Sequence, residues 1–89
     1  MSLNFPNVSR SFEVKRNRVR FWGYDSALEI TFFVDSSLLA KLCPDCGDGE
    51  DGLLKAFDTM IARIHAAARK AYKDDRTRSD IHVLTEGQF

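Results

Sequence analysis

Two cysteines and two histidines have the clearest capacity for chemistry in this chain. Cys43 and Cys46 form a C-x-x-C with a proline inside it, a spacing used in redox sites and in half of many zinc sites. Redox catalysis requires an activated thiolate, which positive charge favours and negative charge opposes. The acidic residues around the pair are Asp45, Asp48, Glu50 and Asp51. Unreactive thiols in a loop are therefore expected.

Zinc binding is the alternative for the same side chains. The candidate ligands are Cys43, Cys46, His65 and His82, a chemically reasonable set for zinc. The histidines lie 17 positions apart, however, whereas zinc fingers separate them by only a few. His65 borders an apolar helical stripe, and His82 alternates with Ile81 and Val83 and is expected to point outward. A zinc-stabilised domain is the least favoured hypothesis, and no cofactor or metal site is expected.

Other catalytic and ion-binding motifs are not found in the sequence. Counted from Asp45, glycines fall where an EF-hand needs oxygen ligands. None of the serines lies in a G-x-S-x-G elbow. The glycines at 47, 49 and 52 lack the lysine of a phosphate-binding loop. We expect a protein that is not an enzyme and has no catalytic residues.

A second set of residues, basic and aromatic, shares one face of a predicted hairpin at 18–34. Side chains alternate between the two faces of a strand. The apolar face carries Val19, Phe21, Leu28, Ile30, Phe32 and Val34. The other face carries Arg18, Arg20, Trp22, Tyr24, Glu29, Thr31 and Phe33. The candidate interaction residues on this second face are Arg18, Arg20, Trp22, Tyr24 and Phe33.

An antiparallel meander of three strands is predicted to position this face. A strand at 10–15, joined to the hairpin by a two-residue loop at 16–17, places Val14 on the core face. The same register sets Glu13 opposite Arg20, a favourable cross-strand pair. The second turn is predicted as a two-residue loop as well. With that loop at Asp25-Ser26, Phe21 lies opposite Ile30.

Two helices and a fourth strand complete the predicted fold. Asp35 is a typical N-cap for a short helix, which must end before Pro44. A long helix starts near Asp48 and carries one apolar stripe as far as Tyr72. Residues 80–85 predict a strand at an edge of the meander. The order βββααβ predicts an α+β two-layer sandwich, with the short and the long helix on one face of the sheet.

Length, composition and charge narrow the function classes. The 89 residues are expected to form a single domain over 1–89, with 1–9 extended or poorly ordered. Thirteen basic residues balance 13 acidic ones, which disfavours nucleic acid as a partner because such binding relies on neutralising phosphates. No segment of the sequence looks like a signal peptide, and no apolar segment is long enough to span a bilayer. A cytoplasmic protein without a membrane partner is expected.

Four segments of the chain resemble a known family. They are FPNVSRSF, VRFWGYDSALEITFFV, GLLKAFD and the closing LTEGQF, and together they are similar to small bacterial proteins called domain of unknown function 1488. The resemblance implies a small, compact α+β bacterial protein. It implies no catalytic or binding residue.

The face around Trp22 is the basis of the functional hypotheses. Trp, Tyr and Arg are the common hot spots of protein interfaces, which favours a small non-enzymatic interaction or regulatory protein. Its partner would be a second copy in a homodimer or another protein. Weak binding of single-stranded nucleic acid, with bases stacked on the aromatic rings, is the alternative. In a third interpretation the face is covered within the molecule and Trp22 is simply packed.

Overall fold

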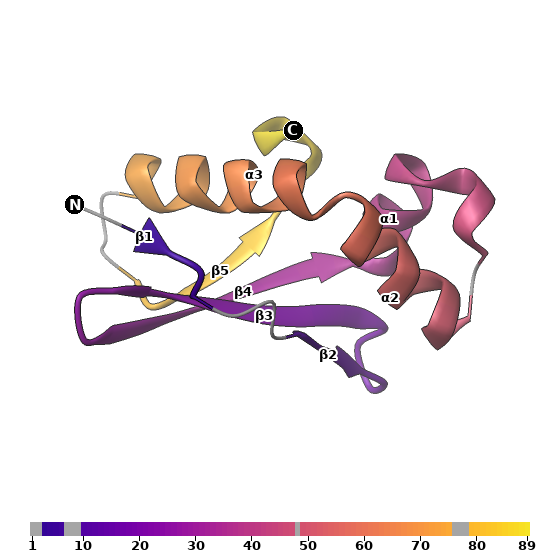
Figure 1. Cartoon of the computed structure of the whole chain (residues 1–89), viewed down its shortest axis with the longest axis horizontal. Coiled ribbons are helices and arrows are strands. Elements are labelled where there is room, and N and C mark those ends of the chain that lie inside the picture. The colour runs from indigo at the N-terminus through magenta and orange to yellow at the C-terminus, as the bar shows by residue number, and fades with distance from the viewer. Residues whose placement is uncertain (1–2, 7–9, 48, 76–78) are drawn as a thin grey trace.

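The described part of the chain forms one mixed sheet with three α-helices on a single face (Figure 1). The computed structural model describes residues 3–6, 10–47, 49–75 and 79–89. The strands are β1 (Leu3–Asn4), β2 (Arg10–Glu13), β3 (Arg18–Asp25), β4 (Leu28–Asp35) and β5 (Ile81–Leu84). The α-helices are α1 (Ser36–Leu42), α2 (Glu50–Thr59) and α3 (Ile61–Asp74), and short 3₁₀ helices span Pro44–Cys46 and Glu86–Gln88. The predicted α+β two-layer class is confirmed.

The eight-residue strands β3 and β4 form the central hairpin of the sheet. Strands β1 and β2 both pair antiparallel with β3, and β5 pairs parallel with β4. The predicted edge position of the last strand is confirmed. Strand β1 lies within the 1–9 segment that was expected to be extended or poorly ordered. Of that segment, residues 1–2 and 7–9 lie outside the described residues.

The registers of both predicted strand pairs are displaced by two residues. Glu13 pairs with Arg18, so the predicted Glu13–Arg20 pair is wrong. Phe21 pairs with Phe32, so the predicted pairing with Ile30 is wrong as well. Because two residues are one full side-chain period in a strand, this error leaves most residues on the predicted face.

The turn sequences explain the displacement. The first turn takes four residues, 14–17, so the first strand ends at Glu13 and not at residue 15. Val14 is consequently exposed, and its predicted core position is wrong. Positive φ angles occur at Asn17 (51°), as turn chemistry predicts, and at Ser26 (57°) in the second turn.

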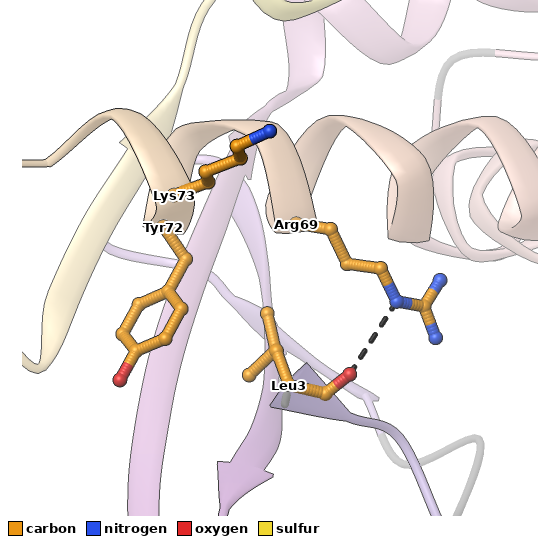
Figure 2. A pocket seen from close by; sticks show the side chains of 4 residues that line it. All are labelled: Leu3, Arg69, Tyr72 and Lys73. Atoms are coloured by element: carbon orange, nitrogen blue, oxygen red, sulfur yellow. Dashed lines mark hydrogen bonds between the residues drawn. The ribbon is translucent and has the colours of Figure 1, made fainter. Parts of the chain in front are cut away.

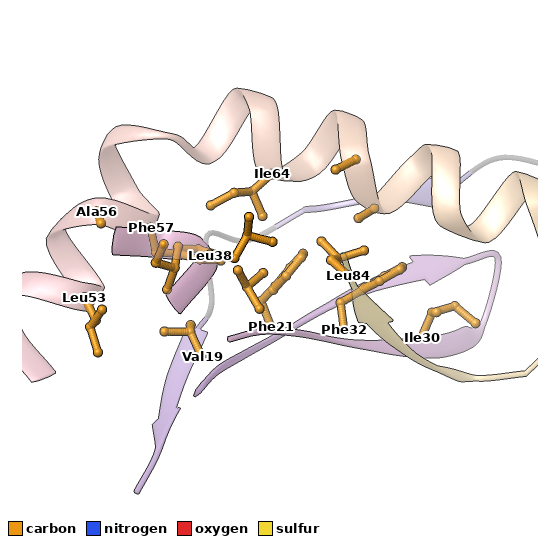
Figure 3. Close-up of a cluster of buried hydrophobic side chains, with 14 of the residues drawn as sticks. Val19, Phe21, Ile30, Phe32, Leu38, Leu53, Ala56, Phe57, Ile64 and Leu84 are labelled. Carbon is orange, nitrogen blue, oxygen red and sulfur yellow. The ribbon is translucent and has the colours of Figure 1, made fainter. Parts of the chain in front are cut away.

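The face of the sheet that the helices cover forms the hydrophobic core (Figure 3). Its largest fully buried side chains are Phe21, Phe32, Phe57, Ile30, Leu39, Ile64, Leu84, Val19 and Val34. The predicted core residue Leu28 is 53% exposed, because it pairs with Asp25 at the end of the hairpin, next to the turn. Every other residue of the predicted apolar hairpin face is buried.

The helices follow the apolar pattern with one interruption. Helix α1 begins after Asp35 and ends before Pro44, as predicted. The predicted long helix is two helices, α2 and α3, which meet at an angle at Met60 (φ −101°, ψ 18°) (Figure 1). The predicted start at Asp48 lies outside the described residues. Among the helices described, none is long and apolar enough to cross a bilayer.

Candidate interaction face

The sheet face opposite the helices, here called the outer face, carries the residues singled out by the sequence. Its members are Arg18, Arg20, Trp22, Tyr24, Glu29, Thr31 and Phe33, together with Ile81 and Val83. In Figure 1 the described helices all lie on the other side of the sheet. The third interpretation of the sequence, an outer face covered by another element, is not seen in the described part of the chain.

Phe33 is covered by an arginine. The guanidinium carbon of Arg18 lies 3.6 Å from the centroid of the Phe33 ring, within the range of a cation–π interaction. The Arg18 Nε donates a hydrogen bond to Glu13 Oε1 at 3.0 Å. The Arg18 side chain is 14% exposed and Phe33 is 9% exposed. The charge of Arg18 is therefore already matched within the molecule.

The centre of the outer face is more open. Trp22 is half-buried, and the guanidinium of the exposed Arg20 lies 5.3 Å from its ring. The Tyr24 hydroxyl donates a long hydrogen bond of 3.5 Å to Glu29 Oε2. Within the described residues, neither Arg20 nor Glu29 has an oppositely charged partner within 4.0 Å. These two charges are available to a binding partner.

Sequence reasoning missed the contribution of β5 to this face. Ile81 and Val83 are 57% and 48% exposed and pair with Thr31 and Phe33 in the register. His82 was predicted to point outward, and this is wrong: its ring stacks on Phe32, with centroids 5.3 Å apart. Because residues at i and i+2 share a face, the apolar Leu84 was the signal that could have placed His82 inside.

The open edge of β5 is partly blocked. The Ser79 hydroxyl donates to the carbonyl oxygen of Ile81 and accepts from its N–H, at 3.0 and 3.1 Å. The N–H of Thr85 donates to the side-chain oxygen of Gln88 at 2.7 Å. Side chains thus occupy backbone groups that an added strand would need. The outer face, and not this edge, is the more accessible docking surface.

Comparison with known proteins identifies the family of this chain and a solved structure with a similar fold. A family model described as "Protein of unknown function (DUF1488)" matches residues 3–84. The chain belongs to the DUF1488 family. It is also similar to a crystal structure of a DUF1488 protein of unknown function from Shewanella loihica PV-4, with a TM-score of 0.77 and 17% identity. The alignment covers 93% of this chain and 92% of that one. No curated protein matches the chain.

The two cysteines of this DUF1488 chain are bonded to each other. Cys43 and Cys46 form a disulfide across the 3₁₀ helix between α1 and α2. The sequence predicted unreactive thiols in a loop and left their pairing open; in the structure they are joined, because the tight turn brings the two side chains together. Among the described residues, no three His, Cys, Asp or Glu side chains are grouped so that they could hold a metal ion. The four ligands of the zinc hypothesis are not brought together.

The first histidine packs against the N-terminal segment. His65 stacks on Phe5 with centroids 3.9 Å apart and planes at 4°. Burial lowers the pKa of His65, and the positive charge of Arg69 lowers it further. The predicted border position is confirmed, with a ring stack as its main contact.

The second histidine forms the pair that most resembles an acid–base site. His82 Nε2 lies 2.8 Å from the Ser79 carbonyl oxygen and 3.6 Å from Asp75 Oδ2. A carbonyl oxygen only accepts, so Nε2 must hold a proton there. The ring is nearly buried between Phe32 and Tyr72. This arrangement suits packing better than proton transfer to a substrate.

Proposed function

We propose that this chain is a non-enzymatic interaction protein whose outer face docks against a second copy of itself. The observation that carries the proposal is the group of aromatic and aliphatic side chains on the outer face. Its half-buried Trp22 lies across Thr31 from Ile81, on the side of the sheet away from the helices. Ile81 and Val83 of β5 add two partly exposed aliphatic side chains to the same face. Adjoining exposed apolar side chains on a small protein are typical of interaction surfaces.

The charges of the outer face favour a second copy as the partner. Arg20 and Glu29 lie on either side of Trp22, about 13 Å apart along the strands at ~3.3 Å per residue. A two-fold axis perpendicular to the strands at the level of Trp22 brings Arg20 of each copy toward Glu29 of the other. A net charge of zero adds no repulsion between the copies.

The same contacts support a protein partner over a nucleic acid. Arg18 is bonded to Glu13 and covers Phe33, so neither is free for a phosphate or for a stacked base. Arg20 remains as the exposed cation among the sequence-selected residues of the face. A strand of nucleic acid requires several cations along its backbone. Binding of single-stranded RNA or DNA is the second candidate function.

A charge swap tests the proposal directly. The wild-type chain is expected to sediment at twice its monomer mass of 10.1 kDa at high concentration. Arg20→Glu and Glu29→Arg should each give a monomer, because each places like charges in contact, and the double variant should restore the dimer. Lys55→Glu is the control for Arg20→Glu: it also replaces a cation with a carboxylate, but on an exposed residue of α2, and it should leave the dimer intact.

Two results would contradict self-association. If the wild-type chain stays monomeric at millimolar concentration, the protein does not self-associate. A dimer that Arg20→Glu leaves unchanged shows that another surface is used. Titration with a single-stranded oligonucleotide tests the second candidate function. Salt-sensitive binding that Arg20→Glu abolishes would favour nucleic-acid binding over self-association.

We also propose a cytoplasmic location for the protein. The Cys43–Cys46 pair, which forms a disulfide in this structure, offers the test, because a reducing cytoplasm would keep both thiols free. Alkylation of intact cells should label both Cys43 and Cys46 if the location is right. Protection of both thiols until a reductant is added would place the chain in an oxidising compartment.

A further inference from the structure

A hollow of about 370 Å³ lies between the C-terminal half of α3 and strand β1, on the helix side of the sheet (Figure 2). Its described lining residues are Leu3, Arg69, Tyr72 and Lys73. The volume is at the lower end of the ~300–1,000 Å³ of typical ligand sites. The hollow is separate from the outer face, which lies across the sheet.

The lining combines an apolar surface with two cations. Leu3 is buried and Tyr72 is half-buried. The Tyr72 hydroxyl donates to Asp25 Oδ2 at 2.6 Å, which holds the aromatic ring in place. Arg69 and Lys73 are exposed and lie one helical turn apart on α3. In Figure 2 the Arg69 guanidinium lies beside Leu3, whereas the Lys73 side chain runs along the helix, with its ammonium farther from Leu3.

These two cations have no carboxylate partner among the described residues. Like charges at this spacing destabilise a helix by a few tenths of a kcal/mol, and a bound anion would remove that cost. Arg69 is also held in position, because its Nε donates to the Leu3 carbonyl oxygen at 3.4 Å and its guanidinium lies 5.1 Å from the Phe5 ring. Asp25 accepts the hydrogen bond from Tyr72, and Asp74 and Asp75 directly follow Lys73 in the chain.

We propose that this hollow binds a small amphipathic carboxylate. The carboxylate group would be bound by the Arg69 guanidinium, and the flexible Lys73 side chain would turn toward it to donate a second charge-assisted hydrogen bond. The apolar part of the ligand would lie against Leu3 and the Tyr72 ring.

Amide NMR titration with hexanoate is the primary test. Saturable shifts are expected at Leu3, Arg69, Tyr72 and Lys73, with a Kd of about 1 mM for so small and open a site. Hexanamide, which has the same shape without the charge, should bind at least about tenfold more weakly. Equal binding of inorganic phosphate and hexanoate would overturn the apolar half of the assignment. The absence of saturable shifts with hexanoate would overturn the site.

Two variants on α3 distinguish binding of the carboxylate by Lys73 from a general effect of positive charge on α3. Lys73→Gln is expected to weaken hexanoate binding about tenfold, the effect of losing one charge-assisted hydrogen bond. Lys70→Gln removes the same charge from a residue that does not line the hollow and should leave the Kd unchanged. An equal loss in both variants would overturn the assignment. Neither variant alters the outer face, so the dimer test and this test fail independently.

Discussion

Phe32 and Phe33 are neighbours on β4 that are buried in different ways. Phe32 faces the helices, is 0% exposed, and contacts the rings of Phe21 and His82. Phe33 faces outward and is 9% exposed because the guanidinium of Arg18 lies over it. A low exposed fraction therefore does not distinguish a core residue from an interface residue. Movement of the Arg18 side chain alone would expose Phe33 on the outer face, whereas exposing Phe32 on the inner face would require the helices to separate from the sheet.

The largest expected effect comes from truncating the two phenylalanines in turn. Phe32→Ala should lower the free energy of unfolding by about 3–5 kcal/mol, because it leaves a cavity in a closed core. Phe33→Ala should lower it by on the order of 1 kcal/mol, since solvent and Arg18 can fill the space. Urea unfolding of both variants measures the difference. Equal losses would mean that the two faces are energetically the same.

The next effect concerns the inner face at β1. A Cβ on Gly23 would lie 2.8 Å from Phe5 Cε1 and 2.9 Å from the Asn4 carbonyl oxygen. Gly23→Ala should therefore cost about 1–3 kcal/mol by displacing the N-terminal segment. Since Phe5 stacks on His65, the pKa of His65 should rise toward its ordinary value of 6.5. NMR titration of the His65 ring checks this, and an unchanged pKa would show that Phe5 has not moved.

A smaller effect is expected from uncovering the outer face. Arg18→Ala removes the cover of Phe33 and the bond to Glu13, and should cost about 1 kcal/mol. It should also increase the binding of a hydrophobic dye at neutral pH. Arg16→Ala is the control, because Arg16 is exposed and lies 3.9 Å from the same carboxylate. Dye binding that rises equally in both variants would contradict the covering role of Arg18.

The smallest expected effect is a dependence of stability on pH at the inner face. Because the folded pKa of His65 is lowered, the unfolded chain binds more protons between that pKa and 6.5. The free energy of unfolding should rise with pH through this window, and the contribution is lost as the pH falls below 6.5. His65→Gln should lack this part of the slope in urea titrations. A slope that is identical in the variant would show that other groups produce it.

Periodicity predicted the faces of the sheet but not its register. Displacing a strand by two residues keeps the same side chains inside, so the hydrophobic pattern cannot distinguish the two alignments. The turns decide between them, and both Asn17 and Ser26 tolerate the positive φ that the observed turns require. Leu28 and Val14 were misplaced because they lie beside the turns, where alternation no longer determines burial.

The remaining differences depend on tertiary contacts. The apolar stripe continues through Met60, so the pattern alone gave no reason to end α2 there. Strand β1 has only two residues, too few for a periodic signal, and it is fixed by its pairing with β3. Of the candidate face, the five residues named from sequence lie together as predicted. Ile81 and Val83 could not be added to the face from the sequence, because their place depends on the parallel pairing of β5 with β4.

The parallel pairing of β5 has a consequence for how the chain folds. Each β4 residue in this pairing meets a partner 50 positions later in the chain, as Thr31 meets Ile81. Contacts of such high sequence separation form slowly, because the loop between them must close first. The β3–β4 hairpin is local and can form early. Strand β4 therefore keeps an unpaired edge until residues 81–84 have been synthesised and docked, and in that interval a nascent chain is most exposed to aggregation.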